Sequence, residues 1–257
     1  MTRSRIYQTT AVVLRYRPLG ETDRLINFFT KSLGRITAVA KGVRRPGSRF
    51  GGTLEPLNLV QLSLARGRNL DNVNECVTIN SFEGLKGDLS TIAQGIYLAE
   101  LVDSFSDDWA SNIALFSLLT DSLNHMNLNK TSDLFIRIFE LKLLNYSGFG
   151  PEFEKCVGCG SDLEPASYGF HFEYGGALCG DCESEEDIFL TRISLDTMKL
   201  LRWIQRQNEN ISDIKIPSVS EQSLRETTVV MRDYLKYVIE HDIRATSFLD
   251  EMKFEST

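Results

Sequence analysis

Hydrophobic and polar positions in the first eighty residues form short runs that predict β-strands. From Leu57 to Leu64 two interleaved sets of positions differ in polarity, which is the period of two expected of a half-buried strand. Gly, Pro and Ser separate this run from four others that are rich in Val, Ile, Leu, Phe and Thr. The expected strands are residues 9–15, 25–29, 36–40, 57–64 and 73–79. Five strands without a helix predict a small barrel, either an oligonucleotide-binding (OB) fold or an SH3-like one.

From about Ser81 the apolar positions recur with a helical period. The expected helix faces are Ile92, Ile96, Ala99 and Val102; Ile113, Phe116, Leu119 and Leu123; Leu134, Ile138 and Leu141; Leu195, Met198, Leu201 and Ile204; and Leu224, Met231, Leu235 and Val238. Ser218 to Glu221 has the spacing of a capping box before the last of these helices. Such faces are core positions, so we predict a helical domain.

A cysteine-rich segment interrupts the helical domain. Cys156 and Cys159 form one Cys-x-x-Cys pair, Cys179 and Cys182 form a second, and nineteen residues lie between the two pairs. This spacing is typical of a zinc ribbon, in which four thiolates close the tetrahedron and the metal stabilises the fold. We therefore expect one structural Zn²⁺, with a redox dithiol or an iron–sulfur cluster as the alternatives. The expected architecture is α+β and multidomain, with an OB barrel (1–80), a helical domain (81–151 and 190–257) and an inserted zinc ribbon (152–189).

Charge divides along the chain. Residues 1–80 contain 13 Lys and Arg against 5 Asp and Glu, and the rest contains 15 against 30. Within the first part, Arg24 to Leu54 contains seven basic residues and no acid. Its Gly- and Pro-containing centre, Lys41 to Gly52, predicts a loop whose cations suit phosphates and whose Phe50 could stack on a base. The alternative is a mobile basic loop without a ligand.

The sequence contains little that suggests catalysis or a membrane. His171-x-Glu173 before the second cysteine pair imitates a zinc deaminase, but only five residues separate Glu173 from Cys179. There is no P-loop, G-x-S-x-G or H-E-x-x-H motif. No apolar run approaches membrane length, and the N-terminus has no apolar segment of a signal peptide. We expect a cytoplasmic binding protein that is not an enzyme.

Several motifs together resemble the RecO family of recombination mediators. They are Gly20-Glu-Thr-Asp-Arg24, Phe28-Phe-Thr-Lys31, Gly34-Arg35, Ala38-Val-Ala-Lys-Gly-Val-Arg-Arg45, Ser48-Arg-Phe-Gly-Gly52, Leu54-Glu-Pro56, Arg66-Gly-Arg68, Arg137-Ile-Phe-Glu-Leu-Lys-Leu-Leu144, Gly148-Phe-Gly-Pro151 and the four cysteines. The resemblance spans nearly the whole chain. It implies an OB barrel followed by a helical domain that carries a zinc-ribbon segment.

The resemblance also implies a function in DNA repair by homologous recombination. Such a protein binds single- and double-stranded DNA, anneals complementary strands without ATP, and with RecR helps to load RecA on strands coated by the single-stranded-DNA-binding protein SSB. An RNA-associated OB and zinc protein is the alternative. A nucleoid-associated location follows from the first possibility.

The sequence gives two sets of candidate binding residues besides the cysteines. For DNA they are Arg24, Arg35, Lys41, Arg44, Arg45, Arg49, Phe50, Arg66 and Arg68. For the acidic, hydrophobic C-terminal tail of SSB they are Arg137 and Lys142, which lie on one expected helix of the helical domain in which the resemblance places the tail-binding pocket. The alternative for Arg137 is an ion pair with Asp133 or Glu140 at helical spacing.

Overall fold

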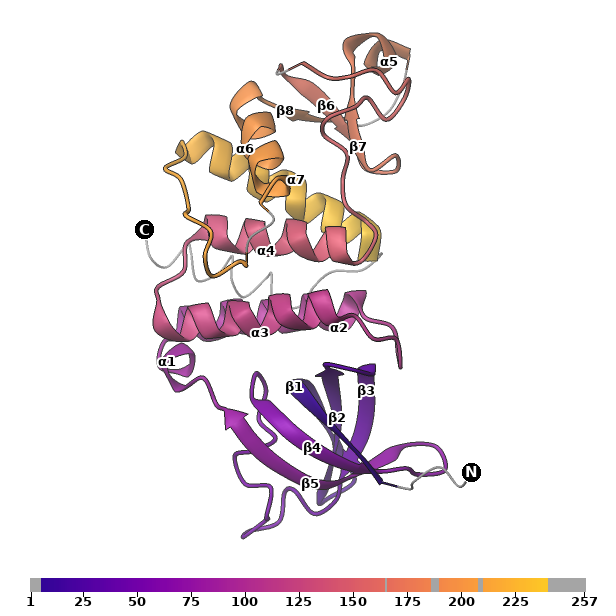
Figure 1. Cartoon of the computed structure of the whole chain (residues 1–257), viewed down its shortest axis with the longest axis vertical. Coiled ribbons are helices and arrows are strands. Elements are labelled where there is room, and N and C mark those ends of the chain that lie inside the picture. The colour runs from indigo at the N-terminus through magenta and orange to yellow at the C-terminus, as the bar shows by residue number, and fades with distance from the viewer. Residues whose placement is uncertain (1–5, 165, 186–189, 208–209, 240–257) are drawn as a thin grey trace. The chain divides into compact units, whose positions relative to one another are not determined.

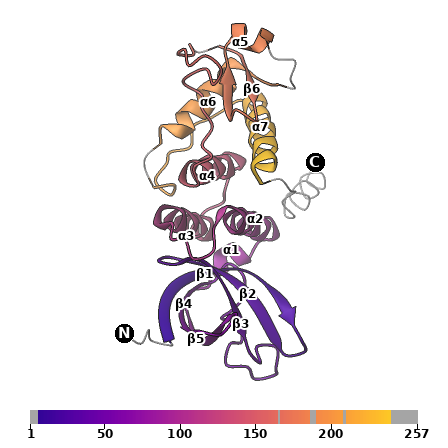
Figure 2. The same ribbon diagram turned by 90° about the vertical axis from the view of Figure 1, so that its right-hand side faces the viewer.

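The computed structural model describes residues 6–164, 166–185, 190–207 and 210–239. Five strands close into a barrel in the order β1-β2-β3-β5-β4, visible as a ring in Figure 2. The strands are β1 (Ile6–Leu19), β2 (Asp23–Thr30), β3 (Gly34–Ala40), β4 (Leu59–Ala65) and β5 (Asp71–Asn80). Antiparallel β1–β4 pairing closes the barrel, and β3 and β5 pair in parallel. This order confirms the OB fold. The expected strand 57–64 begins later, because Leu57 has a φ of 69° that a strand does not accommodate.

Side chains with period two fill the barrel. Val60, Leu62 and Leu64 of β4 are all fully buried, as the alternation predicted. Cys76 on β5 packs against this core, and burial raises the pKa of its thiol to about 12, so it remains protonated.

Three helices follow the barrel: α1 (Glu83–Lys86), α2 (Leu89–Phe105) and α3 (Ile113–Leu128) (Figure 1). The side chains of Asp88 and Asn112 cap α2 and α3 by accepting from backbone N–H groups. The predicted faces are partly wrong, since Ile96 is 37% exposed and Ile113 is 59% exposed. The buried face of α2 instead includes Gly95, where an added Cβ would lie 2.9 Å from Leu57 Cδ1. The buried face of α2 therefore includes a small residue that allows close packing, and it differs from the face that the large apolar residues predicted.

The remaining elements are α4 (Asp133–Tyr146), β6 (Tyr168–His171), β7 (Gly176–Leu178), α5 (Gly180–Glu185), β8 (Thr191–Ile193), α6 (Leu195–Gln205) and α7 (Glu221–Ile239). The strands form a small sheet in the order β7-β6-β8. The apolar faces of α4 and most of those of α6 and α7 are buried as predicted; Leu195 is 37% exposed. Ser220 caps α7 by accepting from Ser223 N, in place of the expected Ser218.

Contacts divide the chain into two compact units, with the boundary after Lys130. The barrel therefore forms one unit with α1, α2 and α3, whereas α4 belongs with the cysteine segment, α6 and α7. This differs from the expected division at residue 80, because ion pairs and packing join α2 to the barrel. The predicted last domain extends to residue 257, and its part from residue 240 lies outside the described residues. Among the described helices none is long and apolar enough to cross a membrane.

Candidate nucleic-acid interface and metal centre

The basic loop between β3 and β4, residues 41–58, is a chain of ordered turns. Successive backbone hydrogen bonds link Arg45 N to Gly42 O (3.1 Å), Ser48 N to Arg45 O (3.0 Å) and Gly51 N to Ser48 O (3.1 Å). The side-chain amide of Asn58 donates to the carbonyls of Gly52 and Thr53 at 2.8 and 2.9 Å. On this scaffold Lys41, Arg44, Arg45 and Arg49 are exposed. The loop thus presents four cations on a defined backbone.

Phe50 has a different role from the one expected. It is 3% exposed and packs, with Leu54, in the barrel core. A buried ring cannot stack on a base, so Phe50 is corrected from a candidate ligand contact to an anchor of the loop. The loop therefore contributes a side chain to the barrel core.

The β1–β2 turn is tied to the basic loop. The amide of Gly42 donates to the Asp23 carboxylate at 2.8 Å, and the amide of Arg44 donates to Thr22 O at 2.9 Å. The hydrogen bond from Gly42, with one from the Thr22 hydroxyl, lowers the pKa of Asp23. The turn and the loop therefore present one continuous surface.

Two of the predicted DNA contacts are already engaged within the protein. The guanidinium of Arg24 lies 3.7 Å from the centroid of the Tyr16 ring and donates to Glu55 at 3.0 Å. Arg35 donates to Asp108 at 2.7 Å and to the carbonyl of Asp103 at 2.6 Å. Both side chains are half-buried. Their charges are already paired within the barrel and at its junction with α2.

Arg66 and Arg68 lie in the β4–β5 loop and are exposed. The guanidinium of Arg66 lies over the rings of Tyr7 and Trp109, at 5.1 and 5.6 Å from their centroids. Six of the predicted cations, on two loops of the same barrel, are therefore accessible.

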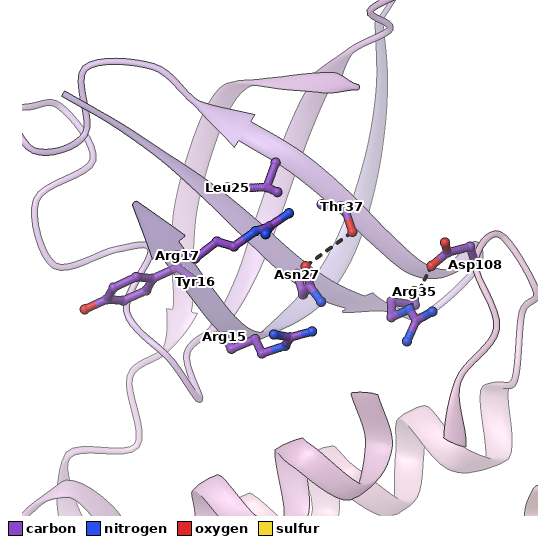
Figure 3. Close-up of a pocket in the computed structure, with 8 residues that line it drawn as sticks. All are labelled: Arg15, Tyr16, Arg17, Leu25, Asn27, Arg35, Thr37 and Asp108. Atoms are coloured by element: carbon purple, nitrogen blue, oxygen red, sulfur yellow. Dashed lines mark hydrogen bonds and ion pairs between the residues drawn. The ribbon is translucent and has the colours of Figure 1, made fainter. Parts of the chain in front are cut away.

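A polar pocket of about 320 Å³ opens on the face formed by β1, β2 and β3 (Figure 3). Arg15 donates to the Asp103 carboxylate at 2.5 Å, and Asn27 donates to the same group at 3.1 Å. Figure 3 shows Arg17 extending along this face from the same strand as Arg15. The pocket is lined by Arg15, Tyr16, Arg17, Leu25, Asn27, Arg35, Thr37 and Asp108. Because Asp103 and Asp108 offset two of the three arginines, the pocket has a small positive excess.

Arg15, Arg17 and Trp109 were not among the residues predicted from the sequence. Arg15 and Arg17 carried a signal, because two cations separated by one residue on a strand point to the same face. Trp109 carried none, since it follows two aspartates in a segment between helices.

The four cysteines come together as predicted. Their sulfur atoms all lie within 4.8 Å of one another, and the Cys159 and Cys179 sulfurs are 3.7 Å apart. A tetrahedral zinc site with bonds of about 2.3 Å requires sulfur–sulfur distances of about 3.8 Å. The cluster therefore fits a closed four-thiolate metal site.

Hydrogen bonds and crowding prepare the thiols for a cation. The hydroxyl and amide of Ser161 lower the pKa of Cys159 to about 6. The neighbouring sulfurs of Cys179 and Cys159 raise the pKa of Cys182, because one thiolate disfavours the next. A divalent cation at the centre removes that conflict.

Local backbone geometry shapes the cysteine knuckle. Gly160 has a φ of +76° and its amide donates to Cys156 O at 2.8 Å, as a tight turn requires. A Cβ on Gly158 would lie 3.0 Å from the Cys182 sulfur, so this glycine permits the close approach. Gly180, which follows Cys179, begins α5 without a positive φ.

A buried arginine fixes the cysteine segment to α6. Arg202 is 7% exposed and donates to Phe153 O at 2.9 and 2.6 Å and to Leu163 O at 2.8 Å. These two carbonyls bracket the first cysteine pair. The guanidinium therefore satisfies backbone groups that burial would otherwise leave without partners.

Arg137 and Lys142 are both buried on α4, at 8% and 5% exposure. Arg137 pairs with Glu140 at 3.0 Å, which is the alternative that helical spacing offered, and Lys142 donates to Gln207 O at 2.7 Å. The geometry gives neither cation access to a peptide, and their binding of a partner tail stays an untested prediction.

The fold and its clusters define a class: an OB-barrel protein with cationic loops, joined to a helical region with a four-cysteine metal-binding cluster. Family models agree with this class. The model described as Recombination protein O N terminal matches residues 1–82, and that described as Recombination protein O C terminal matches residues 86–247. The chain belongs to the RecO family.

Curated relatives named DNA repair protein RecO cover nearly the whole chain. The protein of Roseiflexus sp. (strain RS-1) is 38% identical over 252 residues, which are 98% of this chain and 87% of the relative. That of Dehalococcoides mccartyi is 32% identical over 253 residues, 98% of each. That of Alkaliphilus metalliredigens is 33% identical over 232 residues, 90% of this chain and 92% of the relative.

Proposed function

We propose that this protein acts in DNA repair by homologous recombination, by binding single- and double-stranded DNA and annealing complementary strands without ATP. The observation that carries the proposal is the ordered basic loop of the barrel, with Lys41, Arg44, Arg45 and Arg49 exposed, in a member of the RecO family.

The physics of the loop suits annealing. Cations that cover phosphates reduce the repulsion between two strands, and contacts to the backbone leave the bases free to pair. Neither effect consumes a nucleotide. Four thiolates leave no open position for a reacting water, so the metal cluster fits a structural role and the protein acts by binding.

The test compares two double variants with the same charge change. Arg44→Ala with Arg45→Ala removes two cations of the basic loop, whereas Lys199→Ala with Arg225→Ala removes two exposed cations of α6 and α7. We expect only the first to weaken binding to single-stranded DNA. It should also lower the slope of log affinity against log salt by about 1.4, which is about 0.7 for each lost phosphate contact.

Strand annealing provides the functional readout. The wild type should anneal complementary strands coated by SSB equally well with and without ATP, and the loop variant should anneal more slowly. An unchanged salt slope and annealing rate in the loop variant would contradict the proposal. Single-stranded RNA of equal length, bound more tightly than DNA, would favour the RNA-associated alternative.

We further propose that the protein works with RecR to load RecA on SSB-coated DNA, and that it contacts the SSB tail. These partners rest on family membership. A location in the cytoplasm, at the nucleoid, follows from the same proposal.

We propose that the metal is one structural Zn²⁺ held by Cys156, Cys159, Cys179 and Cys182. Support comes from the four-sulfur donor set and from the 3.7 Å sulfur separation, which suits a zinc tetrahedron. When bound, zinc would join the two cysteine pairs and stabilise the segment between α4 and α6.

A further inference from the structure

An exposed aromatic cluster on the barrel combines side chains from three segments. Tyr7 comes from β1, Arg66 from the β4–β5 loop and Trp109 from the segment between α2 and α3. The ring centroids of Tyr7 and Trp109 are 6.1 Å apart, and the guanidinium of Arg66 lies over both rings. Trp109 is 48% exposed, so a large aromatic surface remains open to a ligand.

The backbone of Trp109 is held in an unfavourable conformation. Its φ of 62° lies in the left-handed region, which a bulky L-residue rarely adopts. Trp109 N donates to Arg35 O at 3.1 Å, and Arg35 N donates to Asp107 O at 3.3 Å. At the neighbouring Gly34, a Cβ would lie 2.1 Å from Ala110 O, so the segment packs directly on the start of β3. Strain that a rigid scaffold maintains is characteristic of binding sites.

A single buried carboxylate organises the other two members. Asp71 is 8% exposed and accepts from the Tyr7 hydroxyl at 2.5 Å and from Gly67 N at 3.0 Å. The position of the Tyr7 ring and the path of the loop that carries Arg66 are thus coupled. The cluster is preorganised, which lowers the cost of binding.

The charges around the cluster favour an anionic ligand. Arg66 and Arg68 are exposed, and residues 65–70 contain no acid. The Asp108 carboxylate is engaged by Arg35 at 2.7 Å. Asp107 contributes an opposing exposed charge, so phosphates would approach from the side of the β4–β5 loop. A half-exposed ring beside exposed cations is the combination that binds single-stranded nucleic acid, in which bases stack on aromatic residues.

We propose that Trp109 stacks on a base of single-stranded DNA while Arg66 and Arg68 contact the neighbouring phosphates. The inference rests on the proposed DNA binding and adds a base contact outside the basic loop. It also gives the site a preference, because bases in a duplex already stack on one another and cannot cover the indole.

Fluorescence and affinity test the proposal together. The chain has two tryptophans, so Trp203→Phe leaves Trp109 as the only one. In this background a deoxythymidine oligonucleotide should quench the emission of Trp109. Trp109→Leu should weaken binding of that oligonucleotide by about 5- to 150-fold, the range for one lost stacked base. Affinity for a duplex of equal length should change less than about twofold.

Further variants separate stacking from charge and from folding. Trp109→Phe should retain most of the affinity, and Tyr237→Leu, which removes a 49% exposed ring from α7, should have no effect. Arg66→Gln should reduce the salt slope by about 0.7, whereas Trp109→Leu should leave that slope unchanged. Trp109→Gly accepts the positive φ, so it tests the loss of the ring without added backbone strain.

The outcomes distinguish this inference from the function on which it rests. Wild-type affinity in Trp109→Leu and Trp109→Gly, with no quenching in the Trp203→Phe background, would overturn the stacking role. Equal losses on single strands and duplex would also overturn it, because a structural defect affects both. If the wild type bound neither form of DNA, the proposed function itself would fail.

Discussion

Neighbouring residues in the basic loop do opposite things. Arg49 is exposed, and its guanidinium lies 4.8 Å from the centroid of the Phe50 ring, which is itself buried in the barrel. The ring fixes the position from which the cation extends. Of these two adjacent residues, Phe50 is part of the barrel core, and Arg49 has the exposure that the proposed DNA binding requires.

This difference can be measured with two single substitutions. Phe50→Ala should lower the free energy of unfolding by about 3–5 kcal/mol, the cost of removing a buried aromatic side chain. Arg49→Ala should change it by less than about 0.5 kcal/mol, as for most surface positions, while weakening DNA binding. Urea denaturation and oligonucleotide titration of the folded protein would check both effects. Similar stabilities of the two variants would show that Phe50 does not anchor the loop.

At the scale of residues, composition predicted which side chains are cationic but not which are available. Arg24 meets Glu55, and Arg35 meets Asp103 and Asp108, partners more than thirty positions away that no local pattern reveals. Phe50 was misassigned because its flanking glycines and arginines mark a loop, whereas burial depends on where the loop folds back. The position of Trp109 beside Tyr7 and Arg66 depends on the packing of the α2–α3 segment against the barrel, which no local pattern reveals.

Among the secondary-structure elements, the start of α6 depends on a carboxylate from α7. Glu226 accepts from Ser194 N at 3.1 Å and from the Thr197 hydroxyl at 2.7 Å. Burial opposes ionisation, but the hydrogen bonds from Ser194 and Thr197 outweigh it and lower the pKa of Glu226 to about 2. The charged carboxylate thus satisfies groups in the first turn of α6.

The sign of the pH dependence follows from that shift. Because the folded-state pKa lies below the unfolded value of about 4.3, the stabilisation is complete above that pH and is lost as the pH falls towards 2. Glu226→Gln should therefore lower the free energy of unfolding by about 1 kcal/mol at pH 6, after allowance for screening by solvent. The difference from wild type should shrink below about pH 4.3 in urea titrations. A difference that is constant down to pH 2.5 would assign the effect to shape and not to charge.

The strands were predictable to within a few residues because both faces of a small barrel follow a period of two. The sequence predicted the helices equally clearly, but it predicted the buried faces of α2 and α3 less well. Ile96 and Ile113 remain exposed, while Gly95 is buried. A hydrophobic pattern identifies large apolar side chains. It does not identify a glycine such as Gly95, which is buried because it allows a neighbouring side chain to approach the helix closely.

At the scale of the whole molecule, the metal cluster and the basic loops belong to different compact units. Cys159→Ser should abolish the binding of one Zn²⁺ per chain and lower stability, while the DNA affinity of the folded barrel stays near that of wild type. Metal analysis together with thermal unfolding and DNA titration would show this. Cys76→Ala is the matched control. The Cys76 thiol packs in the barrel, so its removal should leave the metal content at one ion per chain. Iron, or a metal content near zero without a chelator, would contradict the zinc assignment.

The larger organisation was only partly present in the sequence. The change from strand to helix near residue 80 was clear, since β5 ends at Asn80 and α1 begins at Glu83. The grouping of α2 and α3 with the barrel was not, because it depends on contacts such as Arg15 with Asp103. Charge gave an independent guide, since the basic loops all lie within residues 1–80, where cations outnumber acids by 13 to 5.

The clamp formed by Arg202 has a consequence for biosynthesis. A ribosome makes the chain from its N-terminus, so all four cysteines emerge before the arginine that holds the carbonyls of Phe153 and Leu163. The two carbonyls therefore lack this hydrogen-bond partner until α6 has been synthesised. During that interval metal capture can join the two cysteine pairs, but it cannot seat the segment on the helix. A metal ion that the four cysteines bind in that interval would therefore be bound before the segment packs on α6.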